Sequence, residues 1–260
     1  MLRLLRREGH GQQAALFGAL AFLSLPKLFA QYGAGHLTLL YAIPWTPWLL
    51  VAVKAQETGV RQRKFDIRYL RSGIVLALIF LADPRWAPFA GLLWLGYVIA
   101  HRYKAKLTDG SLNSQASNLE NPTSSLQILT SKVQFLLSNT VLAALLAAPL
   151  TLPLLEYSRL STRNAMAEED IFTYSLPPAR LLGLIFPDFG GFHEWMMYLG
   201  GVVLVLILVA LLAGQPRARI SFWGSVFALG LLISLGNHIP FVDVLARIPG
   251  LDLLRVPSRA

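Results

Sequence analysis

The sequence contains no cysteine, which excludes disulfide bonds and thiolate metal ligands. Charged residues are scarce: they make up 14% of the chain, whereas a soluble domain has about a quarter. Motifs of soluble enzymes are missing as well, because no GxGxxG, Walker, HExxH or GxSxG pattern occurs. The five histidines, at positions 10, 36, 101, 193 and 238, lack the spacing of metal ligands. A histidine metal site is therefore not expected.

Apolar residues, in contrast, make up 55% of the chain and occur in runs separated by polar loops. Loops rich in Lys and Arg alternate with loops that hold most of the acids, which is typical of a protein that crosses a membrane several times. The net charge of +9 does not indicate nucleic-acid binding, because the basic residues lie in short loops between apolar runs. We therefore predict an all-α, polytopic transmembrane helical bundle that forms a single membrane domain, residues 1–260.

About seven stretches are predicted membrane spans, since ~20 residues at ~1.5 Å per residue cross a ~30 Å hydrocarbon core. Charge places the N-terminus in the cytoplasm and the C-terminus outside. Pro26 is expected to kink the first span, with Lys27 reaching outward, and Pro44 and Pro47 to bend the second. The first stretch is alternatively a signal peptide, but no clear A-x-A cleavage site follows it. The predicted spans are 14–32, 37–53, 72–82, 86–101, 133–155, 198–214 and 221–236.

Residues 72–101 are predicted to form a hairpin of two short arms. One continuous helix would be about 45 Å long, with Asp83, Pro84 and Arg85 near its middle. A charge at that depth costs about 2.5–3.5 kcal/mol. Only a hairpin also returns the next basic loop to the side of the preceding one. Its tip is expected in the outer half of the membrane, buried against neighbouring helices.

Three polar segments connect or end the spans. Residues 102–132 are predicted to be a cytoplasmic linker that is flexible where Ser, Asn, Gln and Thr dominate. Residues 156–197 form a long outer loop, and residues 237–260 an amphipathic outer tail. Within the outer loop, Pro177-Pro178 and the apolar stretch Leu181 to Phe186 predict a short amphipathic helix at the interface. It is either a plain membrane-surface helix or a lid over a lipid-linked substrate.

Polar residues that face outward are the candidates for chemistry. Glu168-Glu169-Asp170 is an acidic cluster that could bind a divalent cation or supply a base, or could be simply solvated. Asp83 and Arg85 flank a proline at membrane depth, where ionisable residues are functional candidates. They either pair across the turn as a structural hinge or contact the substrate.

The C-terminal arginines are candidates for binding phosphate. Arg255 and Arg259 flank Pro257, and guanidinium groups bind phosphate oxygens bidentately. The ligand would be a lipid phosphate or pyrophosphate, and the alternative is simple anchoring to headgroups. No catalytic residue or metal ligand is assigned from the residues alone. The candidate substrate-contacting residues are Asp83, Arg85, Glu168, Asp170, Asp188, Glu194, Arg255 and Arg259.

Several stretches, in the right order, resemble bacterial YfhO-type membrane proteins and their relatives in the GT-C glycosyltransferase superfamily. They include LADPRWAP and SLPPARLLGLIFPDFGG, and together they cover about half the chain. Each motif consists of proline, glycine and aromatic residues within apolar sequence and is common by itself. The resemblance is therefore specific only in the combined order of the motifs. The matching stretches are residues 35–48, 81–88, 148–163, 175–191, 198–212 and 232–259.

The resemblance implies an enzyme of the bacterial cytoplasmic membrane that moves a sugar from a polyprenyl-phosphate carrier to an acceptor on the outer face. Its partners would be membrane lipid and the lipid-linked donor. In such families an acid in the first outer loop is the general base, but the first outer turn here, Gln31 to His36, has no acid. We therefore expect a chain truncated at both ends. The alternatives are a non-catalytic membrane scaffold and a transporter or flippase component.

Overall fold

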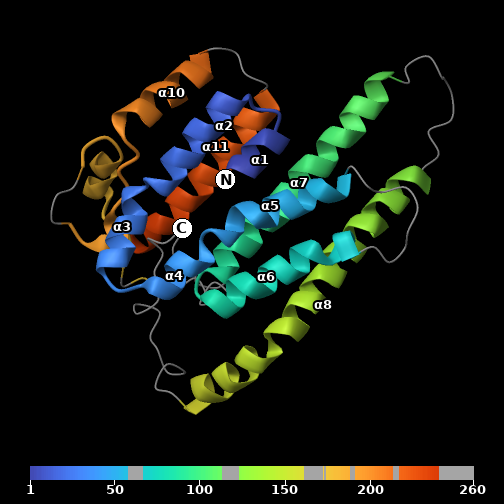
Figure 1. Ribbon diagram of the computed structural model, residues 1–260, viewed down its shortest axis with the longest axis horizontal. Helices are drawn as coiled ribbons and strands as arrows, with labels where there is room; N and C mark the ends of the chain where they lie inside the picture. The colour runs from blue at the N-terminus through green and yellow to red at the C-terminus, as the bar shows by residue number, and fades with distance from the viewer. Residues whose placement is uncertain are drawn as a thin grey trace. The chain divides into compact units, whose positions relative to one another are not determined.

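Helices account for the regular secondary structure of the described part of the chain, in which no residue is in a strand (Figure 1). The all-α prediction is confirmed there. The computed structural model describes residues 1–57, 67–112, 123–160, 172, 174–187, 191–212 and 217–239. By its internal contacts the chain divides into two units, one formed by Met1–Tyr41 with Leu154–Ala260 and the other by Ala42–Pro153.

Four helical segments of the described residues are long and apolar enough to cross a membrane. They are Gln12–Gly33, Leu37–Lys54, Lys132–Tyr157 and Ile220–His238. The other predicted spans are shorter apolar helices, Arg71–Ala82, Ala87–Ala100 and Gly201–Leu212, so the count of about seven spans is not confirmed. A helix of 12 residues rises only about 18 Å, which is less than the ~30 Å of a hydrocarbon core.

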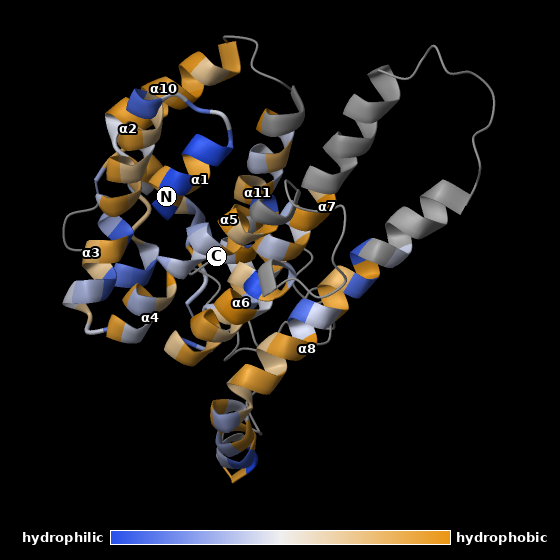
Figure 2. Ribbon diagram, turned by 45° about the vertical axis from the view of Figure 1, so that its right-hand side comes forward, coloured by the Kyte–Doolittle hydropathy of each residue, from blue (hydrophilic) through white to orange (hydrophobic). Residues whose placement is uncertain are grey.

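Many large apolar residues of these helices are exposed. Figure 2 shows that hydrophobic residues predominate along several of them. The helix α10, Gly201–Leu212, buries none of its side chains, and Leu212 is 78% exposed. Contiguous apolar surface of this kind is rare on soluble monomers, because each Å² in water costs about 25 cal/mol. Several helices could thus span a membrane, which indicates a membrane protein.

Prolines set the helix boundaries at the start of the first unit. Its short first helix, α1 (Leu2–Arg7), packs against α2 (Gln12–Leu23). The next helix, α3 (Pro26–Gly33), begins at Pro26, because proline lacks an N–H and fits the first helical position. The predicted kink is therefore a break between two helices. Pro44 acts similarly, since α4 (Leu37–Ala42) ends just before it.

The rest of the first unit contains two short 3₁₀ helices, η3 (Pro178–Leu184) and η4 (His193–Trp195), followed by α10. A short helix was predicted after Pro177, and the 3₁₀ helix η3 is present there. The helix α11 (Arg217–Leu235) leads into the 3₁₀ turn η5 (Gly236–His238). The backbone N–H of Leu176 donates to the carbonyl of Ser234 at 2.7 Å, so the loop before η3 is attached to the end of α11.

The second unit is a group of helices around one apolar core. Its helices α5, α6 and α7 pack against one another in pairs (Figure 1). Large buried side chains at its centre include Leu49, Ile79, Tyr97 and Phe135. The elements are α5 (Trp45–Glu57), η1 (Ile67–Leu70), α6 (Arg71–Ala82), α7 (Ala87–Leu112) and α8 (Thr123–Leu160), of which the second unit includes residues up to Pro153.

The turn of the hairpin predicted over residues 72–101 is confirmed, because α6 ends at Ala82, α7 begins at Ala87, and the two helices pack together. The second arm is longer than predicted, since α7 has 26 residues. The predicted linker, in contrast, is partly helical. Helix α7 continues to Leu112, and α8 already begins at Thr123. Ala, Lys and Leu at the end of α7 have high helix propensity, so helical hydrogen bonding continues past the apolar stretch. Residues 113–122 lie outside the described residues.

Candidate functional site

The eight residues predicted to contact substrate fall into three groups. Asp83 and Arg85 lie in the second unit, and Glu194 lies in the first. The others lie outside the described residues: Glu168, Asp170, Asp188, Arg255 and Arg259. The structure thus describes two candidate places, the Asp83–Arg85 turn and the surroundings of Glu194.

Asp83 and Arg85 form a local ion pair at the tip of the hairpin. Asp83 is the residue that caps the C-terminus of α6, and it is only 1% exposed. The guanidinium of Arg85 donates to both carboxylate oxygens, at 2.9 Å from Nε and 2.7 Å from Nη2. The backbone N–H of Arg85 also donates to Oδ1 at 2.9 Å. Since three donors engage this carboxylate, the contacts favour the structural-hinge interpretation over substrate contact.

Replacing Asp83 by alanine should destabilise the hairpin by roughly 1–3 kcal/mol, because a buried acceptor for a backbone N–H and a guanidinium is lost. The cost should be below the ~3–5 kcal/mol of a fully buried pair, since the Arg85 side chain is 51% exposed. Thermal denaturation in detergent micelles measures this. The exposed Arg71 provides the control, and an Asp83→Ala melting temperature equal to that of Arg71→Ala would contradict the prediction.

Glu194 is the centre of a second polar cluster, in the first unit. It lies in η4, is 2% exposed, and faces α3. Gln31 Nε2 donates to Glu194 Oε2 at 2.9 Å, and Lys27 Nζ donates to the Glu194 backbone carbonyl at 2.6 Å. Both donors come from one face of α3, because residues four apart on a helix are neighbours. Lys27, which was expected to reach outward, therefore reaches a carbonyl in the loop 156–197 that the sequence predicts on the outer side.

Two histidines face the other oxygen of the same carboxylate. His36 Nδ1 lies 3.9 Å from Glu194 Oε1, and His193 Nε2 lies 3.6 Å from it. The two imidazole rings meet edge to face, with centroids 5.0 Å apart. Each histidine side chain is 26% exposed, whereas the carboxylate is buried. The cluster is thus a buried acid that is reached through two partly exposed imidazoles.

The end of α3 explains how His36 is placed. Gly35 has a φ of +77°, its N–H donates to Tyr32, and the His36 N–H donates to the carbonyl of Gln31. These are the two hydrogen bonds of a Schellman motif, which favours glycine at the left-handed position. The motif therefore fixes the backbone of His36 next to Gln31, the residue that holds the carboxylate.

Aromatic side chains surround the cluster. The ring of Phe192 lies 4.4 Å from that of His193 and 5.2 Å from that of Trp195, by centroids, and stacks on Tyr174 at 5.4 Å. The Arg180 guanidinium lies 5.6 Å from the centroid of the Trp195 ring. Two buried polar atoms here, Gln31 Oε1 and Trp195 Nε1, have no hydrogen-bond partner among the described residues. They leave one acceptor and one donor available to a ligand or a water molecule.

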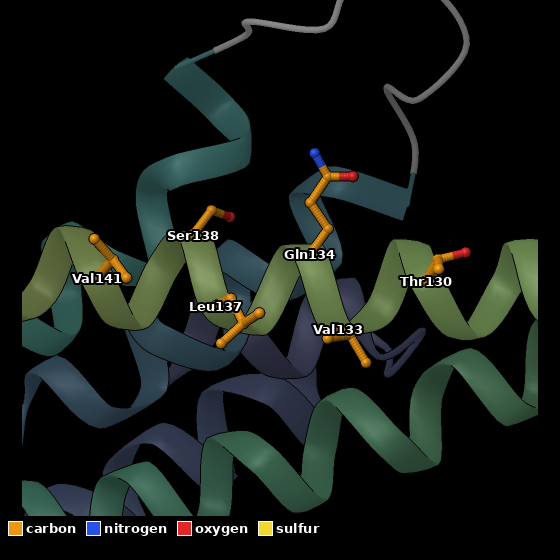
Figure 3. A pocket seen from close by; sticks show the side chains of 6 residues that line it. All are labelled: Thr130, Val133, Gln134, Leu137, Ser138 and Val141. Atoms are coloured by element: carbon orange, nitrogen blue, oxygen red, sulfur yellow. The ribbon is translucent and has the colours of Figure 1, made fainter.

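A groove on the second unit has fewer groups for chemistry than the Glu194 cluster. Its volume is about 630 Å³, and its lining comes from α8 alone (Figure 3). The lining residues are Thr130, Val133, Gln134, Leu137, Ser138 and Val141. None of them is ionisable, so this groove has no group for acid–base chemistry or for binding a metal ion.

The fold and the Glu194 cluster thus describe a helical membrane protein that has a buried carboxylate flanked by two imidazoles. No protein-family model matches the chain, and no significant match was found among curated proteins or solved structures. Sequence reasoning had selected Glu194 but had missed Gln31, Lys27, His36 and His193. The signal that could have found them is topology, because the turn 31–36 and the loop 156–197 were both predicted on the outer side.

Proposed function

We propose that this chain is a GT-C-like glycosyltransferase of the bacterial cytoplasmic membrane. It transfers a sugar from a polyprenyl-phosphate carrier to an acceptor on the extracytoplasmic face. The observation that carries the proposal is the buried carboxylate of Glu194. Its Oε2 accepts from Gln31, and its Oε1 lies 3.9 Å from His36 Nδ1 and 3.6 Å from His193 Nε2. The resemblance of the ordered sequence stretches supports the same reaction.

Topology supports a site on the outer side. The alternation of basic and acidic loops places the N-terminus in the cytoplasm, and hence both the turn 31–36 and the loop 156–197 outside. The hydrogen bond between Gln31 and Glu194 joins these two segments, as a common side requires. The tail begins at the same side, where the Asn237 N–H donates to Ser175 Oγ at 3.1 Å.

Sugar transfer of this kind needs a general base for the acceptor hydroxyl and a cationic group that binds the leaving phosphate. The acceptor hydroxyl attacks the anomeric carbon and a new C–O bond forms there. The bond from that carbon to the phosphate oxygen breaks, and polyprenyl phosphate leaves with the electron pair. The acceptor's proton goes to Glu194 Oε1, the oxygen that Gln31 does not bind. Arg180, beside the neighbouring Trp195, supplies a guanidinium for the phosphate.

Replacing Glu194 by glutamine should lower sugar transfer by about 10²–10⁴-fold, the usual contribution of a general base. The substitution keeps an acceptor for Gln31, so the fold should survive. The assay uses the purified chain in liposomes with labelled polyprenyl-phosphate sugars and follows the label into acceptor. Glu156, an exposed acid at the end of α8, provides the matched control, and Glu156→Gln should transfer at the rate of the unsubstituted chain.

Two results would contradict the proposal. One is equal transfer by the Glu194→Gln and Glu156→Gln variants. The other is the absence of transfer both from this chain and from a version extended at its two ends, which would favour the non-catalytic scaffold.

A transporter or flippase component is the second candidate, and interrupted helices favour it. Discontinuous helices line the substrate sites of many transporters. Here the first apolar segment is broken before Pro26, and the second is broken between Ala42 and Trp45. Movement of labelled donor across the liposome membrane without transfer to acceptor would support this function instead.

A further inference from the structure

We propose that His36, His193 and Glu194 form a binding site for one divalent transition-metal ion, with Zn²⁺ as the ion that fits best. Each residue offers one ligand atom, and these atoms all lie within 4.8 Å of one another. The inference does not rest on the proposed sugar transfer. An ion on Glu194 Oε1 and a proton accepted by that oxygen are alternatives, so the two proposals are tested separately.

The distances are close to those of a tetrahedral zinc site. With bonds of about 2.0–2.2 Å to nitrogen and oxygen, ligand atoms of tetrahedral zinc are about 3.4 Å apart. The observed separations from Glu194 Oε1 are 3.6 Å to His193 Nε2 and 3.9 Å to His36 Nδ1. Small rotations of the two partly exposed imidazoles would close the difference.

The donor set selects the kind of ion. Two imidazole nitrogens and one carboxylate oxygen suit Zn²⁺ and neighbouring transition metals, whereas Mg²⁺ and Ca²⁺ prefer oxygen ligands throughout. Three protein ligands leave the fourth position for water or a substrate oxygen, as in catalytic zinc sites. The partial exposure of the histidines gives the ion a way in.

The surroundings hold the ligands in place, as the outer contacts of metal sites commonly do. Gln31 occupies Glu194 Oε2, which leaves Oε1 directed at the histidines. Lys27 holds the backbone of Glu194, and the Schellman motif at Gly35 fixes that of His36. The ring of Phe192 packs against the His193 ring. The competing explanation is an ion pair between the carboxylate and protonated imidazoles, and titration with Zn²⁺ separates the two.

The test is metal binding by the full chain in detergent micelles, with the affinity tag removed and bound metal stripped by a chelator. Zn²⁺ is titrated in competition with a chromogenic chelator, and Co²⁺ then reports the geometry through its visible absorption. Because the chain has no cysteine, thiolates cannot contribute to either signal. We expect one ion per chain, a tetrahedral Co²⁺ spectrum, and a melting temperature that rises with Zn²⁺ concentration.

Variants locate the ion. His36→Ala, His193→Ala and Glu194→Gln should each weaken Zn²⁺ binding by more than 100-fold, and Gln31→Leu, which removes only a supporting contact, by about 10–100-fold. His10→Ala is the matched control and should bind Zn²⁺ like the unsubstituted chain. If Glu194→Gln fails to fold, the two histidine variants still decide. Equal Zn²⁺ affinity in His10→Ala, His36→Ala and His193→Ala, or no stoichiometric binding by the unsubstituted chain, would overturn the proposal and leave the ion pair.

Discussion

Asn139→Ala should destabilise the second unit by roughly 2–4 kcal/mol. Asn139 is fully buried in α8, and its side chain makes three hydrogen bonds. Its Oδ1 accepts the N–H of Gly73 at 2.7 Å, and its Nδ2 donates to the carbonyls of Tyr69 at 3.1 Å and Phe135 at 2.9 Å. Gly73 lies in the first turn of α6, where helix N–H groups lack intrahelical acceptors, so α8 caps α6 from outside.

The magnitude follows from the groups that lose their partners. Three hydrogen bonds at the ~0.6 kcal/mol average of membrane proteins give the lower end of the range. The upper end applies if the buried N–H of Gly73 is left unsatisfied, which costs about 1–3 kcal/mol more. Thermal denaturation in micelles, followed by circular dichroism, gives the difference. Ser138→Ala is the control, because the Ser138 hydroxyl donates only to a carbonyl of its own helix, at 3.1 Å. If Asn139→Ala has the same melting temperature as Ser138→Ala, the hydrogen bonds of Asn139 contribute nothing to stability.

An aspartate at this position tests the direction of the hydrogen bonds. Asn139→Asp keeps an acceptor for the Gly73 N–H but directs a carboxylate oxygen at the carbonyls of Tyr69 and Phe135. A buried unpaired charge costs more than a missing amide. We therefore expect Asn139→Asp to melt below Asn139→Ala. The opposite order would mean that the amide is not oriented as described.

Local pattern predicted much of the fold. Apolar runs located the helices, the charged tip at Asp83 separated α6 from α7, and Pro26 and Pro44 lie at or next to helix boundaries. These features depend on residues within one or two turns of each other. The number of spans did not follow, because hydropathy says where a run is apolar but not whether its helix is long enough to cross. Helix α10, with 12 residues, shows the difference.

The candidate site was only partly predictable for a related reason. Asp83 and Arg85 are two residues apart, so a pairing of the two was one of the interpretations that the sequence offered. The contacts of Glu194 join residues 163 and 167 positions apart, and no local motif records them. Only the alternation of basic and acidic loops predicts that these two segments lie on the same side of the membrane. That prediction would have allowed the histidines at 36 and 193 to be considered as parts of one site. Asn139, a single amide in an apolar span, likewise gave no sign of its partner.

Gly73→Ala should destabilise the second unit by about 1–3 kcal/mol, the usual cost of an added methyl in a packed interior. A Cβ at Gly73 would lie 2.6 Å from the carbonyl oxygen of Asn139 and 3.1 Å from its Cα. Both atoms belong to the backbone of α8, so no side-chain rotation relieves the overlap and the helices must separate. Small residues allow such close approach between membrane helices.

Gly91 provides the matched control. It lies in α7, and a Cβ there would meet nothing within 4 Å. Gly91→Ala should therefore raise stability by up to ~1 kcal/mol, the gain in helix propensity. Equal melting temperatures for Gly73→Ala and Gly91→Ala would contradict the close approach of α6 and α8.

The two substitutions at this contact should also couple. If Gly73→Ala separates the helices, it also stretches the bond from the Gly73 N–H to Asn139 Oδ1, so adding Asn139→Ala should cost less than it does alone. A double-mutant cycle in micelles measures this coupling, which is about 0.5–3 kcal/mol for residues in contact. Strict additivity would mean that the overlap relaxes without moving the helices apart, and that the cap and the close approach are separate features.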